Sequence, residues 1–327
     1  MHKYETATQK MEGNKYKGLL YGILYGLIAK VIFCSGFSAG TVTPVFGITT
    51  LSFLVLVPFV IGLIVAWQQY TAKATISNAL LAVAGLLGFV ILLQESLLYV
   101  LIVLPAYILM VIAGSFAGRY LWAAKKRHLL LVTGILAPFL IAPIERSLGA
   151  NETIYAQSTT ISINASDDSV WQHIVKVEAT REEQNKEAAF RVSGFPQPIE
   201  AIFDTVTPGG SRKAFFNRGL IFTETITAVV PGKTLAFTIK SDPGSKPLTD
   251  LEKHVIVEGK YFEVLKGQYE VEKINEQQIK LHLTVTYRLS THFNVYCAWW
   301  AKIIMDRIQK SILQIVKQSS ETTNPEH

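Results

Sequence analysis

Cysteine is scarce in this chain of 327 residues, which contains only Cys34 and Cys297. The first lies in an apolar segment and the second in a polar half of the chain, so we do not expect them to pair. The sequence therefore lacks both the spaced cysteines of a disulfide framework and the paired cysteines of a zinc site. We predict neither a disulfide nor a metal site.

Catalytic sequence motifs are also missing. The chain contains no phosphate-binding glycine loop, no HExxH motif and no spacing of serine, histidine and aspartate typical of a nucleophilic triad. These absences exclude the enzyme classes that depend on such motifs, and they give no reason to expect a cofactor. If the protein is an enzyme, one or two acid or base groups must carry the reaction.

Charge is almost absent from five long segments of the first 150 residues. A hydrocarbon core of about 30 Å requires about 20 helical residues, and four of these segments reach that length. The fifth is shorter and contains Pro138 and Pro143. We predict an all-helical, polytopic membrane domain over residues 1–148, with spans at about 18–40, 46–67, 76–93, 97–122 and 129–144.

The lysines and arginines of the connections predict the orientation of these spans, because such residues stay on the cytoplasmic side. The cations that flank the spans all fall on alternate connections: Lys3, Lys10, Lys15, Lys17, Lys73, Arg119, Lys125, Lys126 and Arg127. A cytoplasmic N-terminus followed by five spans of the plasma or inner membrane places residues from about 150 onward in the periplasm or outside the cell. If the short fifth segment does not cross, those residues are cytoplasmic instead.

Net charge differs between the two halves of the chain. The formal net charge is +6, yet residues 1–150 contain 11 Lys/Arg against 4 Asp/Glu, whereas residues 151–327 contain 20 against 21. The excess of cations therefore reflects membrane topology, and the polar half lacks the basic balance of a nucleic-acid-binding domain. The first apolar segment is too long for a cleaved signal peptide.

Two features of the first span have alternative interpretations. Gly18, Gly22 and Gly26 lie on one helical face, where small residues allow two helices to approach closely. They serve either packing within the bundle or a homodimer interface. Lys30 lies near the middle of the span, where a charge is unfavourable, so it is a candidate for ion or substrate passage. A lysine that faces other helices is the simpler interpretation, since no acid lies within the spans.

The second half alternates between short polar turns and strand-like runs. A strand precedes a short helix that begins at Ser166, several further strands follow, and a long amphipathic helix closes the chain. We predict a linker over 149–157, a folded domain over 158–318 and a disordered tail over 319–327. The expected strands lie at 158–164, 201–206, 213–217, 220–229, 234–240, 254–258, 261–265, 268–274 and 280–289, and the expected closing helix at 293–318.

This order of elements resembles the START/polyketide-cyclase-like superfamily (SRPBCC), which has the helix-grip fold. The resemblance is carried by TTISINASDDSVWQHI at its start, FNRGLIFTETIT and HVIVEGKYFEVLKGQYEV in the middle, and YRLSTHFNVYCAWWAKIIMDRIQKSILQIVK at its end. It implies an α+β domain in which a curved antiparallel sheet surrounds the last helix and leaves an elongated apolar cavity. Members bind lipids or other hydrophobic molecules, and some catalyse cyclisation or hydration. The membrane half resembles no family.

Strand periodicity places one carboxyl group among apolar neighbours. Glu224 shares a strand face with Leu220, Phe222 and Ile226, so it is a candidate acid/base or ligand anchor. Alternatively, Glu224 pairs with Arg218, or a bulge turns it toward solvent.

Further ligand-binding candidates lie on the later elements. Leu283 and Tyr287 occupy the apolar face of the last strand, and Tyr261 and Trp300 are aromatic candidates for the same cavity. His254, at the start of a strand, is a second candidate acid/base, although a lone histidine there is more often a surface group.

Three functions agree with these features. The first is a membrane-anchored protein whose outward domain binds a hydrophobic small molecule or a lipid, with membrane lipids as its surroundings. The second is a cyclase or hydratase that uses Glu224. The third is a membrane-bound interaction module with a filled core and no ligand.

Overall fold

The computed structural model describes residues 16–34, 50–67, 71–92, 97–123, 127–178, 197–202, 205–242, 244–245 and 261–322. The chain divides into two compact units, Met1–Ala150 and Asn151–His327. The boundary lies two residues after the predicted end of the membrane domain. His254 lies outside the described residues, as does the strand expected at 254–258.

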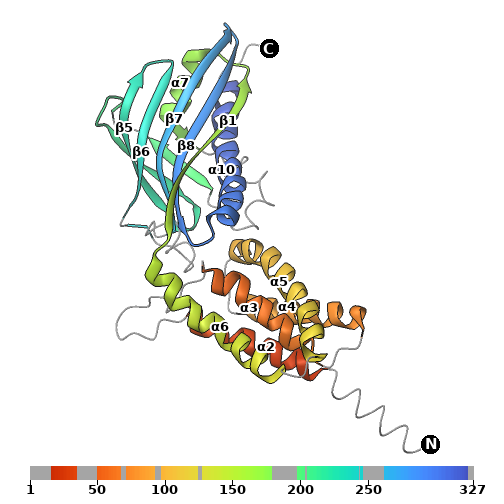
Figure 1. The fold of residues 1–327 in the computed structure, drawn as a ribbon. Helices are drawn as coiled ribbons and strands as arrows, with labels where there is room; N and C mark the ends of the chain where they lie inside the picture. Colours follow the sequence, from red (N-terminus) through yellow and green to blue (C-terminus); the bar gives the residue numbers. More distant parts are fainter. Residues whose placement is uncertain are drawn as a thin grey trace, which may run out of the picture. The chain divides into compact units, whose positions relative to one another are not determined.

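The first unit is helical wherever it is described (Figure 1). Its elements are α2 (Lys17–Cys34), the π-helical η1 (Ser52–Leu56), which continues into α3 (Val57–Val65), α4 (Ala72–Leu92), α5 (Leu97–Ala123) and α6 (Arg127–Leu148).

Two of these helices, within the described residues, are long and apolar enough to cross a membrane. They are Ala72–Phe89 in α4 and Val100–Leu121 in α5, whereas Ser52–Val65 is a shorter apolar helix. The prediction of five full spans is therefore not supported by helix length and composition. In α2, Lys30 interrupts the apolar stretch, and in α6 only residues 129–144 separate the charged ends.

Contacts inside the first unit show that successive helices alternate in direction. The start of α2 lies against the end of α3, α3 and α5 run in the same direction, and so do α2 and α6. The contacts that fix these directions are Gly18 with Val65, Phe59 with Gly114, Ala66 with Gly118, Tyr25 with Ile135, and Phe33 with Phe139. The described cations Lys17, Lys73 and Arg119 consequently lie toward one end of the helical unit, whereas Arg146 lies in the last turn of α6.

The glycine face of α2 is buried within the first unit. A Cβ atom at Gly18 would lie 2.9 Å from the carbonyl oxygen of Val65, and one at Gly22 would lie 2.6 Å from the Val65 side chain. A Cβ at Gly26 would lie 2.8 Å from Leu86 of α4. These glycines let α2 approach α3 and α4 closely. Of the two interpretations of this face, these contacts correspond to packing within the bundle; the homodimer interface stays a prediction.

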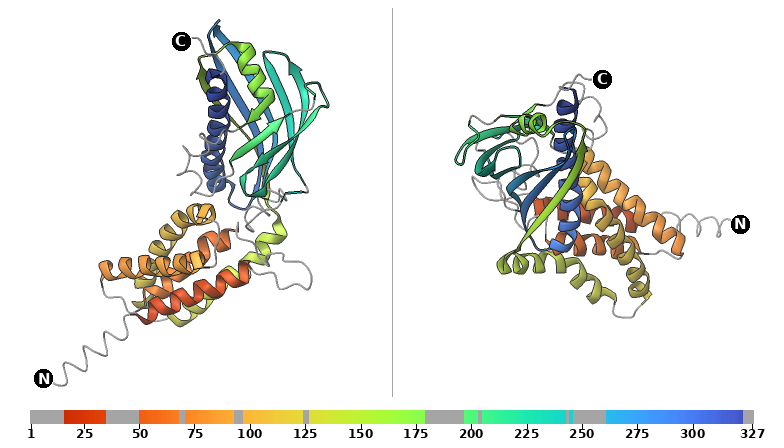
Figure 2. Two further views of the ribbon diagram at one scale, coloured as in Figure 1. Left: turned by 180° about the vertical axis from the view of Figure 1, so that it is seen from behind. Right: turned by 90° about the horizontal axis from the view of Figure 1, so that it is seen from above.

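The second unit contains one eight-stranded antiparallel sheet with the order β1-β8-β7-β6-β5-β4-β3-β2. Its strands are β1 (Asn151–Ile163), β2 (Lys176–Glu178), β3 (Pro198–Ile202), β4 (Ser211–Phe216), β5 (Ile221–Val230), β6 (Thr234–Ser241), β7 (Phe262–Asn275) and β8 (Gln278–Thr291). The 3-10 turn η2 (Asn217–Gly219) connects β4 to β5. The sheet curls, and its concave side faces α7 (Asp167–Val175) and α10 (Asn294–Thr322) (Figure 2). This curled sheet with a long C-terminal helix fits the helix-grip fold.

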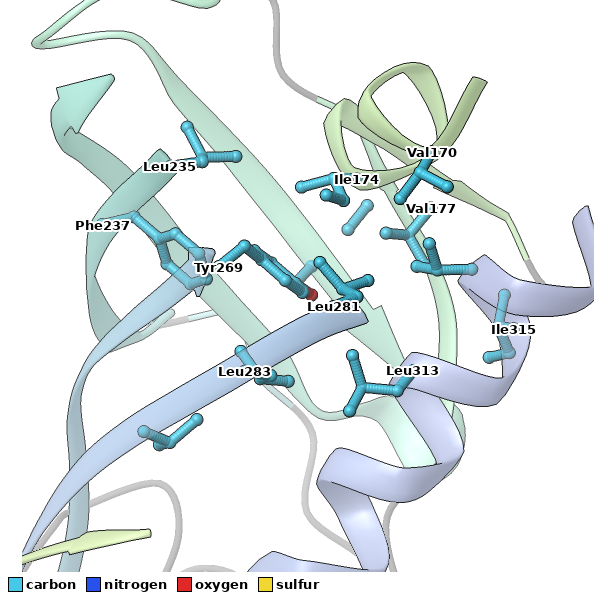
Figure 3. Close-up of a cluster of buried hydrophobic side chains, with 14 of the residues drawn as sticks. Val170, Ile174, Val177, Leu235, Phe237, Tyr269, Leu281, Leu283, Leu313 and Ile315 are labelled. Carbon is cyan, nitrogen blue, oxygen red and sulfur yellow. The ribbon is translucent and has the colours of Figure 1, made fainter. Parts of the chain in front are cut away.

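The strand faces follow the alternation in the sequence. In β8 every second residue from Ile279 to Leu289 is buried, and these side chains join residues of α7 and α10 in one apolar core (Figure 3). α7 begins at an N-cap formed by Ser166, whose Oγ accepts a hydrogen bond from the Ser169 N–H, as its sequence predicts.

Some predicted boundaries in this unit are wrong. Residues 151–157 are not a linker but the first half of β1, which pairs with β8 from Asn151 onward. The segments expected as two strands at 261–265 and 268–274 form the single strand β7, because a register shift between Val264 and Lys266 absorbs the irregular residue. Residues 319–322, expected to be disordered, continue α10.

The buried positions of α10 include Ala301, Met305, Gln309, Leu313, Ile315 and Val316. Gln309 is among them although it is polar, and its side chain is completely buried.

Candidate functional site

The concave face of the sheet has one closed end and one more open end. Near the end of α10, core residues such as Ile163, Ile174 and Leu313 have no solvent exposure. Toward the start of α10, Tyr287 and Leu289 are buried, but several of their neighbours on the concave face are only partly buried: Phe222, Ile239, Phe262, Val264 and Ala298. This end, the open end of the concave face, therefore presents some apolar surface that the described core does not fully enclose.

Glu224 lies on this concave face and is 8% exposed. Its predicted position among apolar neighbours is correct, but its partner is Arg212 of β4. Arg212 Nε lies 2.6 Å from Glu224 Oε2, and the two residues are directly opposite each other in the pairing of β4 with β5. The alternative of a bulge that turns Glu224 to solvent does not apply. Arg218 lies in η2, and its side chain is outside the described set.

Arg212 connects the sheet to α7. Its Nη1 donates to the carbonyl oxygens of Ile174 and Val175 at 3.4 Å each, and to that of Ala201 in β3 at 3.3 Å. The last carbonyl groups of a helix lack partners within the helix, and a cation is favourable beside them. The guanidinium also lies over the ring of Phe237, 5.6 Å from its centroid. Arg212 thus holds α7, β3, β4 and β5 together.

Tyr269 of β7 belongs to the same polar cluster. Burial raises the pKa of Tyr269 to about 12; the nearby Glu224 carboxylate raises it further, whereas Arg212 opposes the shift through its charge and a hydrogen bond. The phenol therefore stays protonated at all physiological pH values. An ionised carboxylate, a guanidinium and a neutral phenol are together in an otherwise apolar core.

The chemical capacity of this cluster lies chiefly in Glu224. Oε2 is taken up by Arg212, whereas Oε1 receives no hydrogen bond from any side chain or backbone group in the described parts of the chain. A carboxylate oxygen can accept a hydrogen bond from a hydroxyl or amine that enters the concave face. The cluster is suited to hold one polar group of a mostly apolar molecule.

Aromatic rings form a second cluster on the same face. Tyr287 of β8 is buried, and its ring lies 5.8 Å from that of Tyr155 in β1 and 5.4 Å from that of Phe262 in β7. Burial raises the pKa of Tyr287, and the neighbouring Tyr155 raises it further. Leu283, two residues earlier on β8, is also buried in the core.

The remaining predicted site residues occupy separate places. Trp300 lies on α10, and its indole Nε1 is buried without a hydrogen-bond partner in the part of the chain that is described. Tyr261 is half-buried just before β7, where its carbonyl oxygen accepts a hydrogen bond from the Ser290 N–H at 2.9 Å. Lys30 lies in α2, four residues before the end of that helix, and is half-buried. Among the described residues, no group of histidine, cysteine and acidic side chains could hold a metal ion.

Sequence reasoning missed Arg212 and Tyr269. The signal for Arg212 was present, because a β-hairpin with its turn centred on Arg218 places residue 212 opposite residue 224. No comparable signal existed for Tyr269, which reaches the cluster from a strand two positions away in the sheet.

No protein-family model matches the sequence, and no curated protein matches it. Solved structures similar to this chain include a START superfamily protein from Mycobacterium smegmatis, with 8% identity over 52% of this chain and 99% of that one and a TM-score of 0.35. A truncated norcoclaurine synthase from Thalictrum flavum is 12% identical over 54% of this chain and 97% of that one, with a TM-score of 0.33. At these values the fold assignment rests on the sheet topology and the position of α10, and not on the likeness.

Proposed function

We propose that this protein is anchored in a membrane and binds a hydrophobic small molecule or a lipid in its helix-grip unit, between the sheet and α10. The observation that carries the proposal is the apolar concave face, on which several side chains are only partly buried and on which the Glu224 carboxylate lies.

The polar atoms near this apolar surface favour a ligand over a filled core. A buried polar group without a partner is unfavourable, and natural proteins seldom keep one without a role. Trp300 Nε1 on α10 is a buried donor without a hydrogen-bond partner among the described residues, and the Glu224 carboxylate on the concave face offers an acceptor. A ligand with one or two polar groups on an apolar body would satisfy such atoms. A hydroxylated lipid or isoprenoid has this character.

Membrane anchoring is supported by apolar side chains on the outside of the helical unit. In α6, the side chains at every fourth position are exposed along the whole helix: Val132, Leu136, Leu140, Ile144 and Leu148. Further large apolar residues are exposed on α2, α4 and α5, and Leu109 of α5 is 62% exposed. An apolar surface of this extent is unfavourable in water but favourable in lipid.

The proposed topology is multi-pass, with a cytoplasmic N-terminus and the helix-grip unit in the periplasm or outside the cell. Helices that alternate in direction are expected of successive spans. Of the described cations at the helix ends, Lys17, Lys73 and Arg119 gather toward one end of the unit, which the positive-inside rule assigns to the cytoplasm, whereas Arg146 lies in the last turn of α6. Glu145 near the end of α6 instead accepts a hydrogen bond from the Ser52 N–H at the start of η1, 3.0 Å away.

A second candidate function is an enzyme of the cyclase or hydratase kind. The observation in its favour is that Glu224 lies close enough to Tyr269, a second group that carries a proton, for the Glu224 charge to raise the pKa of Tyr269. Against it, Glu224 Oε2 is already held by Arg212 Nε at 2.6 Å, so one of its two oxygens is engaged in an ion pair within the core. A ligand recovered chemically unchanged after prolonged incubation would favour binding, whereas turnover that Glu224→Gln abolishes would favour catalysis.

The proposal can be tested by native mass spectrometry of the full chain released from detergent micelles or nanodiscs. We expect a discrete added mass that disappears on denaturation and whose fragmentation gives a hydrophobic molecule. Ala298→Phe, which places a ring at the open end of the concave face, should remove the added mass. Ala228→Phe, on an exposed position of β5, is the matched control and should retain it. An unliganded mass after incubation with membrane lipid extract would instead support an interaction module.

A further inference from the structure

The helix-grip unit exposes large apolar side chains at the start of α10. Val295 is 83% exposed and Trp299 is 56% exposed. Ile154, which is 65% exposed, lies three residues into β1. Exposure of single apolar residues is common on protein surfaces, but a tryptophan and a valine one turn apart on a helix face form a patch that needs an explanation.

The character of this helix face changes sharply along α10. Residues 295, 299, 302, 306 and 310 follow one another at intervals of three or four, so they lie along one stripe. The first two positions are Val295 and Trp299, and from Lys302 onward the stripe is charged, with Lys310 Nζ 2.8 Å from Asp306 Oδ2. The change from apolar to charged takes place over about 10 Å of helix. This gradient is typical of a helix whose first turns enter the interfacial layer of a membrane, where tryptophan is favoured and lysine extends its ammonium group toward water.

The chain itself keeps this part of α10 close to the end of α6. Only Gly149 and Ala150 separate Leu148, the last residue of α6, from Asn151, the first of β1. Three Cα steps span at most about 11 Å, whatever the orientation of the two units. The first turn of α10 is joined to the start of β1, because Asn294 Nδ2 donates to the Asn151 carbonyl oxygen at 2.6 Å and contacts Thr153 Oγ1 at 3.1 Å.

The stripe of exposed apolar side chains of α6 indicates which kind of surface the patch formed by Val295 and Trp299 contacts. The stripe continues to Leu148, which is 80% exposed, so the lipid surface proposed for α6 extends to within a few residues of β1. Because only Gly149 and Ala150 separate Leu148 from Asn151, the chain connection keeps a patch tied to Asn151 within reach of the lipid surface if α6 is in the membrane. A bilayer interface fits both its composition and its short connection.

We propose that the first two turns of α10, through Val295 and Trp299, insert into the interfacial layer of the bilayer in which α6 is anchored. The proposal rests on the membrane anchoring proposed above. The partly buried apolar side chains of the concave face lie toward the start of the same helix, so insertion of Val295 and Trp299 would bring that end of the face near the lipid. The ligand class that this geometry favours is one that resides in the membrane.

The experiment uses full-length protein in nanodiscs of phosphatidylcholine and phosphatidylglycerol, prepared with and without lipids brominated on their acyl chains. Bromine quenches only tryptophans that reach the lipid. The fluorescence emission of Trp299 is obtained by subtracting the emission of the Trp299→Phe variant from that of the unsubstituted protein. Residue 299 is exposed, so this substitution leaves the core intact. The emissions of Trp171, on α7, and of Trp67, in the helical unit, serve as two references. Each is obtained in the same way, from Trp171→Phe and Trp67→Phe.

We expect brominated lipid to remove about half of the Trp299 emission, as for tryptophans at membrane interfaces, and to leave that of Trp171 unchanged. Trp171 is suited as a negative reference because α7 lies at the opposite end of α10, where Ser169 Oγ donates to the Ser320 carbonyl oxygen. If Trp67 is quenched and Trp299 is not, the insertion of α10 is refuted and the membrane anchor stands. If neither is quenched, the anchor proposed for the helical unit is itself wrong, and the insertion fails with it.

Discussion

The ion pair between Arg212 and Glu224 allows one stability prediction to be worked out in detail. Arg212→Met removes the guanidinium but keeps an unbranched side chain of similar length. The Glu224 carboxylate then remains in the core with no partner for Oε2, and the carbonyl oxygens of Ile174, Val175 and Ala201 lose a donor. Both consequences follow from one substitution because Arg212 is the shared partner.

The magnitude follows from these contacts. Removal of one partner from a buried ion pair costs about 3–5 kcal/mol, because the other charge stays buried. The bonds to the carbonyl oxygens are long, at 3.3 to 3.4 Å, so together they add only about 1 kcal/mol. The total is about 4–6 kcal/mol. For a folded unit of this size, each kcal/mol lowers Tm by about 2–4 °C, so we expect Tm of the helix-grip unit to fall by about 10–20 °C.

Glu224→Gln is the informative comparison. The amide oxygen still accepts the hydrogen bond from Arg212 Nε, and the carbonyl contacts of Arg212 remain, so only the charge of the acceptor is lost. We expect a smaller cost of about 2 kcal/mol. The double variant Arg212→Met, Glu224→Leu removes both charges and should be more stable than Arg212→Met alone, because no buried carboxylate is left unpaired.

The assay is thermal unfolding of the full chain in detergent, combined with hydrogen–deuterium exchange read by mass spectrometry. Exchange in α7 and in β4 and β5 should rise strongly in Arg212→Met and only slightly in Glu224→Gln. Equal destabilisation by the two single variants would refute the reasoning, since it would mean that Arg212 contributes nothing beyond its pair with Glu224. Unchanged exchange in α7 would contradict the role of Arg212 as the connection to that helix.

Three further predictions concern other parts of the structure. The pKa of Tyr269 is raised to about 12 from its ordinary value of 10.0. Its stabilising contribution of about 2–3 kcal/mol is therefore complete below pH 10 and is lost as pH rises to 12. Tm measured from pH 8 to 12 should fall less steeply in Tyr269→Phe than in the unsubstituted protein, and parallel curves would contradict this. Gly114→Ala should lower the melting temperature of the helical unit strongly, because the added Cβ would overlap the Phe59 carbonyl oxygen. Gly88→Ala, with open space around it, should be neutral or slightly stabilising. Equal effects of the two substitutions would disprove the close approach of α3 to α5. Gln309→Ala should destabilise the helix-grip unit by about 1–3 kcal/mol in denaturant unfolding, because Thr159 Oγ1 loses the buried acceptor that lies 2.6 Å away. A change near zero would show that this hydrogen bond does not hold α10 to β1.

The sequence predicted the elements of the helix-grip unit well because strand and helix periodicities are local properties. The alternation through β5 placed Glu224 on the inner face, and the pattern of β8 placed Leu283 and Tyr287 there too, without knowledge of any partner strand. Errors arose where a local pattern was ambiguous. The polar run before Ser158 hides the first half of β1, whose strand character depends on its pairing with β8.

The helical unit shows the same division. Apolar composition alone located its helices, and the spacing of Gly18, Gly22 and Gly26 indicated close packing. Whether those glycines faced another helix of the same chain or a second copy could not be decided from one helix, because both partners demand the same small residues. In the structure, these glycines contact α3 and α4 of the same chain.

By itself, then, the sequence determined the order of the elements, the face on which each side chain lies and the uneven distribution of charge between the two halves. These depend on the chain's own periodicity and composition. Only the tertiary structure decided that Glu224 pairs with Arg212 and that Tyr269 joins them, because those contacts depend on strand register and on the curl of the sheet. Gln309 illustrates the limit most clearly: a polar side chain looks solvent-exposed in any sequence pattern until the strand that satisfies it is in place.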